Sequence, residues 1–295
     1  MSMTTKEASQ KWKISDRRVR ALCIKGKIDG AKLVKNEWLI PDEATKPTDG
    51  RTSIDSLVTR INNLKNELDS KRPLTEGEAT RLNEEFITEY TYNSNAIEGN
   101  TLTLRETELV LRGLTIAKKP LKDHLEVVGH KEAFDYIVSL VKDKENITPF
   151  IIKQIHFLVL ADKPQDRGVF RRIPVRIVGA KHIPVDPLLI EEKLNELLKW
   201  YYETDEDFLT KLAKFHIEFE AIHPFIDGNG RTGRLLVNLE LMKLGYPPID
   251  IKYTDRIAYY QAFDSYHSRN DLKPMIKLFG KYLTQRLNKY LSILK

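Results

Sequence analysis

Residues 223–234 read HPFIDGNGRTGR and form the densest group of chemically active side chains in the sequence. Pro224 stops the preceding helix, so His223 lies at that helix's C-terminal end, where the macrodipole favours a protonated imidazole. Gly228 and Gly230 let a ligand approach the backbone, and a helix beginning near Gly230 directs its free N–H groups into the same space. The stretch therefore predicts an anion-binding turn between two helices.

One carboxylate and two arginines complete this turn. Arg231 and Arg234 are three residues apart, so both are expected to reach around one polyphosphate. Asp227 offers a hard oxygen to a Mg²⁺ ion that is held by one carboxylate and phosphate groups. Together with a base and an anion nest, these groups indicate phosphoryl or nucleotidyl transfer. An EF-hand, a di-iron bundle and a Walker loop each lack required residues here.

The sequence of the rest of the main body, which follows the N-terminal segment, predicts helices. Capping boxes and prolines at first helical positions mark four helix starts, at Thr75/Glu78, Thr103/Glu106, Thr148-Pro149 and Asp186-Pro187. The one clear β signal is Val175–Val178 followed by His182–Val185, which predicts a hairpin flap. We therefore expect an all-α body with one β-hairpin flap. The histidines outside the motif, His156 and His216 among them, are interpreted as packing or solvent-exposed residues.

The excess of positive over negative charge lies in the N-terminal segment. The whole chain of 295 residues has a formal net charge of +6, and residues 1–40 alone hold ten Lys/Arg against four Asp/Glu. This segment predicts helices through Trp12 and over Asp16–Lys25, then short strands at Ala31–Val34 and Glu37–Ile40. A helix, turn, helix and hairpin is a winged-helix pattern, so a basic module is attached to a neutral body.

This N-terminal module, residues 1–46, resembles the excisionase/MerR-like DNA-binding family. The resemblance implies that the second helix enters the major groove, with Arg17, Arg18 and Arg20 on phosphates or base edges. The alternative is a solvated basic helix on a module that contacts only protein. Residues 47–75 are expected to form a linker and a connecting helix, because apolar residues recur at helical spacing after a polar stretch.

The motif itself resembles the Fic family. HPFIDGNGRTGR matches the signature HPFxDGNGRxxR at all nine specified positions. Agreement extends outside it, to Gly168-Val169-Phe170-Arg171, to Gly245-Tyr246-Pro247-Pro248 and to Tyr259-Tyr260. The resemblance implies a Fic-type helical core over residues 76–295 and an enzyme that transfers AMP from ATP to a hydroxyl side chain of a protein.

The resemblance also assigns roles to the motif residues. It implies that His223 deprotonates the Ser, Thr or Tyr hydroxyl of the target and that Asp227 holds Mg²⁺ on the α- and β-phosphates. Arg231 steadies the leaving pyrophosphate and Arg234 grips the γ-phosphate. The phosphate nest is lined by Gly228, Asn229 and Gly230. Phe225 is interpreted as core packing that fixes the loop.

Two further segments take roles from the same resemblance. The flap, with Val175, Ile177 and His182, is implied to align the target by strand addition; it is alternatively only a surface hairpin. Tyr259 and Tyr260 resemble the nucleoside-pocket tyrosines of the family. The family often places an asparagine two turns after these tyrosines. In this sequence, His267 lies in that region instead.

Residues 94–100, SNAIEGN, match the family's inhibitory pattern. Gly99 ends a helix near residues 91–98, which puts Glu98 in the last turn, where its charge opposes the macrodipole. The resemblance names Arg234 as its partner, so that Glu98 blocks the γ-phosphate while Ser94 anchors the helix. An inhibitory segment that precedes the motif in the chain is typical of a class II Fic protein. The alternatives are a surface glutamate or one that positions water for AMP removal.

The sequence thus predicts an autoinhibited, Mg²⁺- and ATP-dependent protein adenylyltransferase that modifies a target protein or itself. The alternatives are a DNA-binding regulator whose Fic domain senses nucleotide, and a Fic enzyme that removes AMP. DNA through residues 1–46 and a homodimer are the other expected partners. The single cysteine, Cys23, cannot form an intrachain disulfide, and the chain lacks a membrane-length apolar run, so a cytoplasmic location is expected.

Overall fold

The computed structural model describes residues 2–24, 26–35, 37–47, 50–177, 179 and 182–294. The chain divides into two compact units, Met1–Ser56 and Leu57–Lys295. The division falls within helix α3 (Gly50–Asp69), later than the expected end of the N-terminal module at residue 46.

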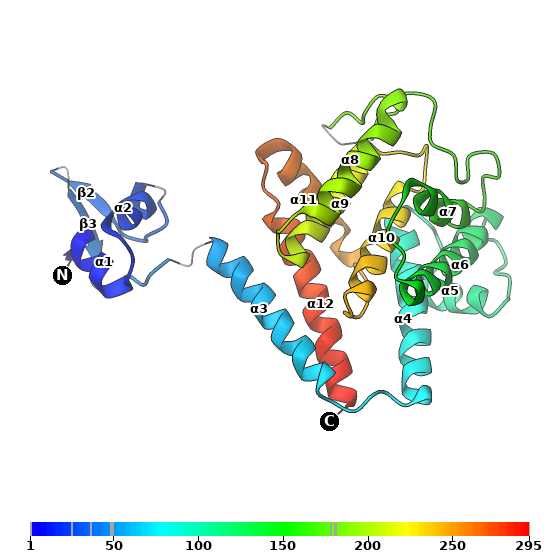
Figure 1. Cartoon of the computed structure of the whole chain (residues 1–295), viewed down its shortest axis with the longest axis horizontal. Coiled ribbons are helices and arrows are strands. Elements are labelled where there is room, and N and C mark those ends of the chain that lie inside the picture. The colour runs from blue at the N-terminus through cyan, green and yellow to red at the C-terminus, as the bar shows by residue number, and fades with distance from the viewer. Residues whose placement is uncertain are drawn as a thin grey trace. The chain divides into compact units, whose positions relative to one another are not determined.

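The N-terminal unit combines two helices with a small sheet (Figure 1). Helix α1 (Thr5–Trp12) begins with a capping box of Thr4 and Glu7. Helix α2 spans Asp16–Ile24, and the Ser15 hydroxyl accepts a hydrogen bond from the Arg18 N–H. Strands β2 (Lys32–Val34) and β3 (Glu37–Pro41) form the expected antiparallel hairpin. A third strand, β1 (Ser2–Thr4), was not expected, and it pairs with β3 to give the order β1-β3-β2.

A small core holds these elements together. Met3, Ala8, Trp12, Val19, Cys23, Ile28 and Ile40 are buried against one another. The Cys23 thiol is one of these core groups, and burial raises its pKa. Both helices and the strands β1 and β3 supply buried side chains, whereas β2 is exposed, so the unit has a hydrophobic core of its own.

The second unit is helical, as expected. Its helices after α3 are α4 (Glu76–Ile97), α5 (Leu104–Leu111), α6 (Leu121–Asp143), α7 (Pro149–Val159), α8 (Ile190–Glu203), α9 (Phe208–Ile222), α10 (Asn229–Lys243), α11 (Arg256–Arg269) and α12 (Lys273–Ile293), with 3₁₀ turns at Pro187–Leu189 and Tyr253–Asp255. The capping residues at Thr75, Thr103, Thr148 and Asp186 each accept a backbone hydrogen bond at the predicted starts. Within the described residues, no helix is both long and apolar enough to cross a membrane.

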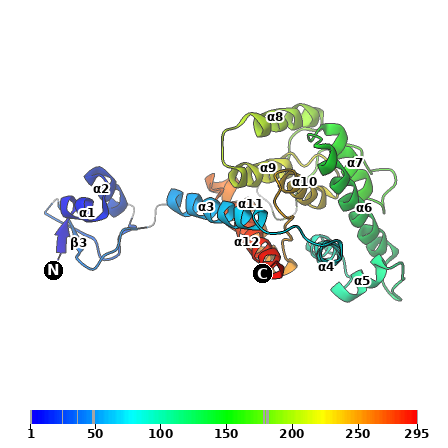
Figure 2. The same cartoon turned by 60° about the horizontal axis from the view of Figure 1, so that its bottom comes forward.

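Helix α10 lies at the centre of this unit. It packs against α4, α6, α7 and α9 (Figure 2), and residues 231–241 are all buried. Helix α9 packs through an apolar face, with Leu212, Phe215 and Phe219 fully buried. Because α10 begins directly after the 223–228 turn, this packing fixes the position of the helix end that carries the motif.

The flap is not the expected hairpin. Neither Val175–Ile177 nor His182–Val185 is in a strand; Val178, Ala180 and Lys181 lie outside the described residues. Pro174 directly precedes the first arm and Pro184 lies within the second, and neither has the N–H group that strand pairing needs. The prediction of two paired strands was therefore wrong for the described residues, although the segment does form an extended loop between α7 and α8.

Candidate active site

The 223–228 turn is held by its own side chains. His223 is the left-handed C-cap of α9, with φ 51° and ψ 61°. The Asn229 side chain closes the turn, since its Oδ1 accepts from the Phe225 N–H and its Nδ2 donates to the Phe225 carbonyl, both at 2.9 Å. Asn229 was expected to line the phosphate nest, but its amide is used to shape the loop.

His156 of α7 supports this turn from below, a role that the interpretation as a packing residue missed. Its ring stacks on the buried Phe225 ring at 3.6 Å between centroids. The Gly168 N–H donates to Nδ1, so Nε2 carries the proton and donates to the Asp227 carbonyl at 2.9 Å. Burial lowers the pKa of His156 to about 4. The neutral ring therefore ties α7 to two loops of the site.

The state of the His223 imidazole suits a general base. Nδ1 lies 3.3 Å from the Glu220 carbonyl, which can only accept, so Nδ1 carries the proton and the Nε2 lone pair is available. Burial lowers the pKa of His223, and the hydrogen bond to Glu220 offsets only part of this effect. The sequence predicted that the helix end favours the protonated ring, but the net shift has the opposite direction, because burial disfavours the charged form.

Glu98 occupies the anion-binding end of α10. It is the C-cap of α4, and its Oε1 accepts from Arg234 Nη2 at 2.8 Å. A Cβ at Gly230 would lie 2.3 Å from the same oxygen, so only glycine admits the carboxylate here. The first N–H groups of α10 have no intrahelical acceptor. The carboxylate therefore rests where an anionic ligand would bind.

Arg234 is buried and held by three residues. Its Nε donates to the Ser94 hydroxyl at 3.0 Å, and Nη2 also donates to the Ser94 carbonyl at 2.8 Å. Nη1 lies 3.4 Å from the Tyr259 hydroxyl. Burial lowers the pKa of Arg234, but Glu98 and Tyr259 raise it by more, so the guanidinium stays charged. The predicted residues Ser94, Glu98 and Arg234 are thus brought together.

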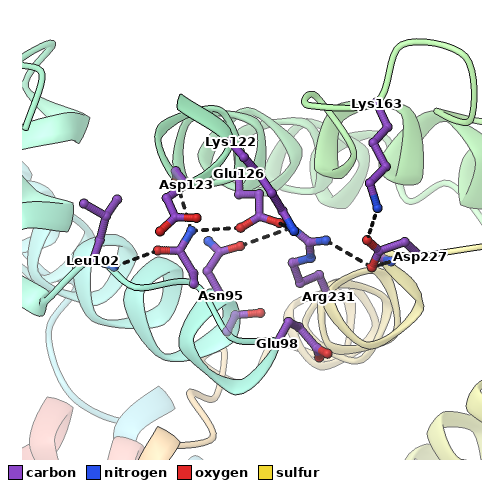
Figure 3. A network of polar contacts seen from close by, with 12 residues as sticks. Asn95, Glu98, Leu102, Lys122, Asp123, Glu126, Lys163, Asp227 and Arg231 are labelled. Atoms are coloured by element: carbon purple, nitrogen blue, oxygen red, sulfur yellow. Dashed lines mark hydrogen bonds and ion pairs between the residues drawn. The ribbon is translucent and has the colours of Figure 1, made fainter. Parts of the chain in front are cut away.

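Arg231 points to a different set of partners (Figure 3). Its guanidinium is buried, with Nη1 3.1 Å from Glu126 Oε1 on α6 and Nη2 3.5 Å from Asp227 Oδ1. Glu126 in turn accepts from Asn100, two residues after Glu98, at 2.9 Å. The two arginines therefore do not converge on one point as the sequence suggested, and Glu126 was not identified from the sequence at all.

Asp227 is the one carboxylate of the motif. Its Oδ1 accepts from the Gly228 N–H at 2.6 Å and its Oδ2 from Lys163 Nζ at 2.5 Å. Burial raises the pKa of Asp227, but Lys163 and Arg231 lower it by more, to about 2. The described residues contain no group of three or more His, Cys, Asp or Glu able to cage a metal. An ionised, half-buried carboxylate nevertheless fits a Mg²⁺ ion that takes its other ligands from phosphates and water.

Arg171 fixes the base of the flap segment to the site. This buried side chain donates to the His223 carbonyl at 2.8 Å, to the Ile173 carbonyl at 3.0 Å and to the Val185 carbonyl at 2.5 Å. Farther along, His182 Nε2 lies 2.9 Å from the Ala221 carbonyl, and its ring stacks on His267 of α11. Both ends of the segment are therefore attached to the last turn of α9, next to His223.

The two tyrosines of α11 have different surroundings. Tyr259 is fully buried, and its hydroxyl lies 2.6 Å from His216 Nε2. Tyr260 is 40% exposed and its hydroxyl donates to the Ile97 carbonyl at 3.3 Å. Of the two predicted nucleoside contacts, Tyr260 alone presents a surface, and Tyr259 supports Arg234.

Glu220 is a buried acid near the site that was not predicted from the sequence as a site residue. Its Oε1 has no hydrogen-bond partner in the described part of the chain. Burial, together with the Glu98 charge, raises the pKa of Glu220 to about 8. Burial therefore favours the neutral carboxylic acid, which limits the negative charge beneath the anion site.

Comparison with known proteins agrees with this geometry. Residues 146–241 match the Fic/DOC family. A protein adenylyltransferase Fic of Nematostella vectensis is 35% identical over 210 residues, which make up 69% of this chain and 48% of that protein. The chain therefore spans about half the length of the curated relatives it matches.

Solved structures extend the match to the fold. A fragment of Fic-1 from C. elegans is 27% identical with a TM-score of 0.75, covering 82% of this chain and 73% of that chain. A second structure of the fragment, with one glutamate replaced by glycine, is 30% identical with a TM-score of 0.70 and the same coverage. On the combined strength of the motif, the helical core and these similarities, the chain belongs to the Fic/DOC family.

Proposed function

We propose that this protein is a protein adenylyltransferase, which transfers AMP from ATP to a Ser, Thr or Tyr hydroxyl of a target protein or of itself, and that Glu98 inhibits it. The observation that carries the proposal is the Glu98 carboxylate, which lies on Arg234 at the N-terminus of α10. A site that binds its own carboxylate in this way is suited to bind a phosphate there instead.

His223 supplies the base for the reaction. Its neutral ring has a free Nε2, which takes the proton of the attacking hydroxyl as the oxygen bonds to the α-phosphorus. The bond from the α-phosphorus to the bridging oxygen breaks, and pyrophosphate leaves. The N–H groups at the start of α10 and the Arg234 guanidinium face the phosphate charge.

Asp227 would hold Mg²⁺, and the ion would neutralise charge on the phosphates. The carboxylate is suited to this because its low pKa keeps it ionised. The buried Arg231 pairs with the Asp227 carboxylate from the protein side, and Arg231 is itself held by an ion pair with Glu126. We thus assign Arg231 mainly to fixing Asp227 at the pyrophosphate end of the site.

Glu98 inhibits by occupying the partner of the γ-phosphate. While Arg234 Nη2 donates to Glu98, the guanidinium is not available for phosphate, and two anions cannot share the helix end. Ser94 strengthens the inhibited state because its hydroxyl and carbonyl both accept from Arg234. This arrangement supports the class II form of inhibition that the 94–100 segment predicts.

The proposal is tested by following two labels in the full chain. Glu98→Gly protein incubated with ATP labelled at the α-phosphate should become labelled, alone or in a cell lysate. The same protein with ATP labelled at the γ-phosphate should remain unlabelled, because pyrophosphate leaves. Transfer of the γ-label, or of neither label, would contradict AMP transfer. Loss of AMP from a pre-modified protein would instead support the AMP-removing alternative.

A second function, DNA binding, is favoured by the surface of α2. We propose that Arg17, Arg18 and Arg20 contact DNA, because all three are exposed while Val19 and Cys23 of the same helix face the core. Arg20 also pairs with Asp16 at 2.9 Å, so part of its positive charge is neutralised within the helix. The two helices and the β2–β3 hairpin support a winged-helix module.

A further inference from the structure

Asp227, the carboxylate assigned to the divalent cation, already carries a cation of the protein. Lys163 Nζ lies 2.5 Å from Asp227 Oδ2, whereas Arg231 approaches the other carboxylate oxygen (Figure 3). Oδ1 is occupied differently, by the Gly228 N–H at 2.6 Å and by Arg231 at 3.5 Å. Oδ2 is therefore the oxygen that a metal ion would take, and Lys163 is the group that stands on it.

The position of Lys163 is built into the fold. It follows the end of α7, where its N–H donates to the Leu160 carbonyl and its own carbonyl accepts from the N–H groups of Asp166 and Arg167. This turn fixes the backbone on both sides of the residue. The side chain therefore starts from a defined point next to the 223–228 turn, and its approach to Asp227 follows from that anchoring.

The two cations on Asp227 differ in how easily they can leave. The side chain of Arg231 is 1% exposed and is also paired with Glu126. The side chain of Lys163 is 37% exposed, and the acidic group it pairs with is Asp227. An exposed lysine can be hydrated when its partner is taken, whereas a buried arginine cannot. Arg231 is thus the permanent partner and Lys163 the replaceable one.

We propose that Lys163 competes with the divalent cation for the Asp227 carboxylate and thereby weakens cation binding to the free enzyme. This inference rests on the proposed function, in which Asp227 holds Mg²⁺. A Mg²⁺ ion needs oxygen at about 2.0–2.1 Å, and it repels an ammonium on the same oxygen. The cation therefore binds only as Lys163 withdraws.

Binding of Mn²⁺ to the full chain, followed by electron paramagnetic resonance without nucleotide, tests the competition. Lys163→Met should bind Mn²⁺ about two- to fivefold more tightly than the wild type, as expected for removal of an exposed ion pair. Lys163→Arg, which keeps the charge, should bind no more tightly than the wild type. Lys289→Met, which removes a lysine paired with Glu85, serves as the matched control and should change nothing.

Asp227→Asn separates the failure of this inference from the failure of the proposed function. If Asp227→Asn abolishes Mn²⁺ binding but Lys163→Met leaves it unchanged or weaker, the competition is refuted and the metal role of Asp227 stands. If Asp227→Asn has no effect on any variant, both are refuted. Should Lys163→Met not fold, as judged by circular dichroism, Lys163→Gln gives the same comparison with a polar side chain.

Discussion

Replacement of Glu98 by glycine is the perturbation with the largest expected effect. It removes the acceptor that lies 2.8 Å from Arg234 Nη2. The next residue, Gly99, is also a glycine and has a φ of 95°, so the helix already ends at this point. A hydrogen bond between charged groups contributes about 1.5–3 kcal/mol net. ATP must break this contact before the γ-phosphate reaches Arg234, so its removal should raise the rate of AMP transfer about 10- to 150-fold.

The assay for Glu98→Gly is the initial rate of α-label transfer at saturating ATP. Glu98→Gln is the matched control, because it keeps a hydrogen-bond acceptor for Arg234 but loses the charge, and its rate should lie between those of the wild type and Glu98→Gly. The glycine variant should also be less stable by about 1–3 kcal/mol, since the buried Arg234 loses one acceptor. Equal transfer rates in all three proteins would refute inhibition by Glu98.

Three further predictions concern the base, its support and the N-terminal unit. The rate should be constant above the ordinary His pKa and should fall only at pH values below it, since burial lowers the pKa of His223 and the neutral ring is the active form; a rate that halves near pH 7 would contradict this. His156→Phe keeps the stack on Phe225 but removes the hydrogen bond to Asp227, so it should lower the transfer rate at least tenfold while circular dichroism stays unchanged; full activity would show that the tie is dispensable. The triple variant Arg17→Ala, Arg18→Ala, Arg20→Ala should weaken binding to duplex DNA and reduce its salt dependence, as measured by fluorescence anisotropy; unchanged binding would exclude α2 as the DNA-contacting surface.

Local signals in the sequence identified most helix starts correctly. A capping box or a proline acts within a few residues, so the starts of α1, α4, α5 and α7 follow from the residues that form them. The pair of Glu98 and Arg234, although distant in the chain, was predicted correctly from the family resemblance. Strand β1 is three residues long and mostly polar, so its pairing with β3 depends on a partner that periodicity does not show.

Other contacts made across the fold were not revealed by the sequence. Arg231 was expected to face phosphate, but Glu126 on another helix turns it into a buried support for Asp227. His156 reaches the motif from α7, and Lys163 reaches it from the turn after α7. Neither residue belongs to a recognisable sequence pattern. The direction of the pKa shift of His223 also depends on burial, which is a property of the packed structure.

The most direct test of the account compares Glu98→Gly with Glu98→Gly/His223→Ala in one experiment. Mass spectrometry measures AMP adducts after incubation with ATP and Mg²⁺, and equilibrium dialysis measures ATP binding by the same two proteins. The single variant should gain the adduct, whereas the double variant should bind ATP with similar affinity and gain none. An undiminished adduct on the double variant would contradict the central claim that His223 takes the proton of the attacking hydroxyl.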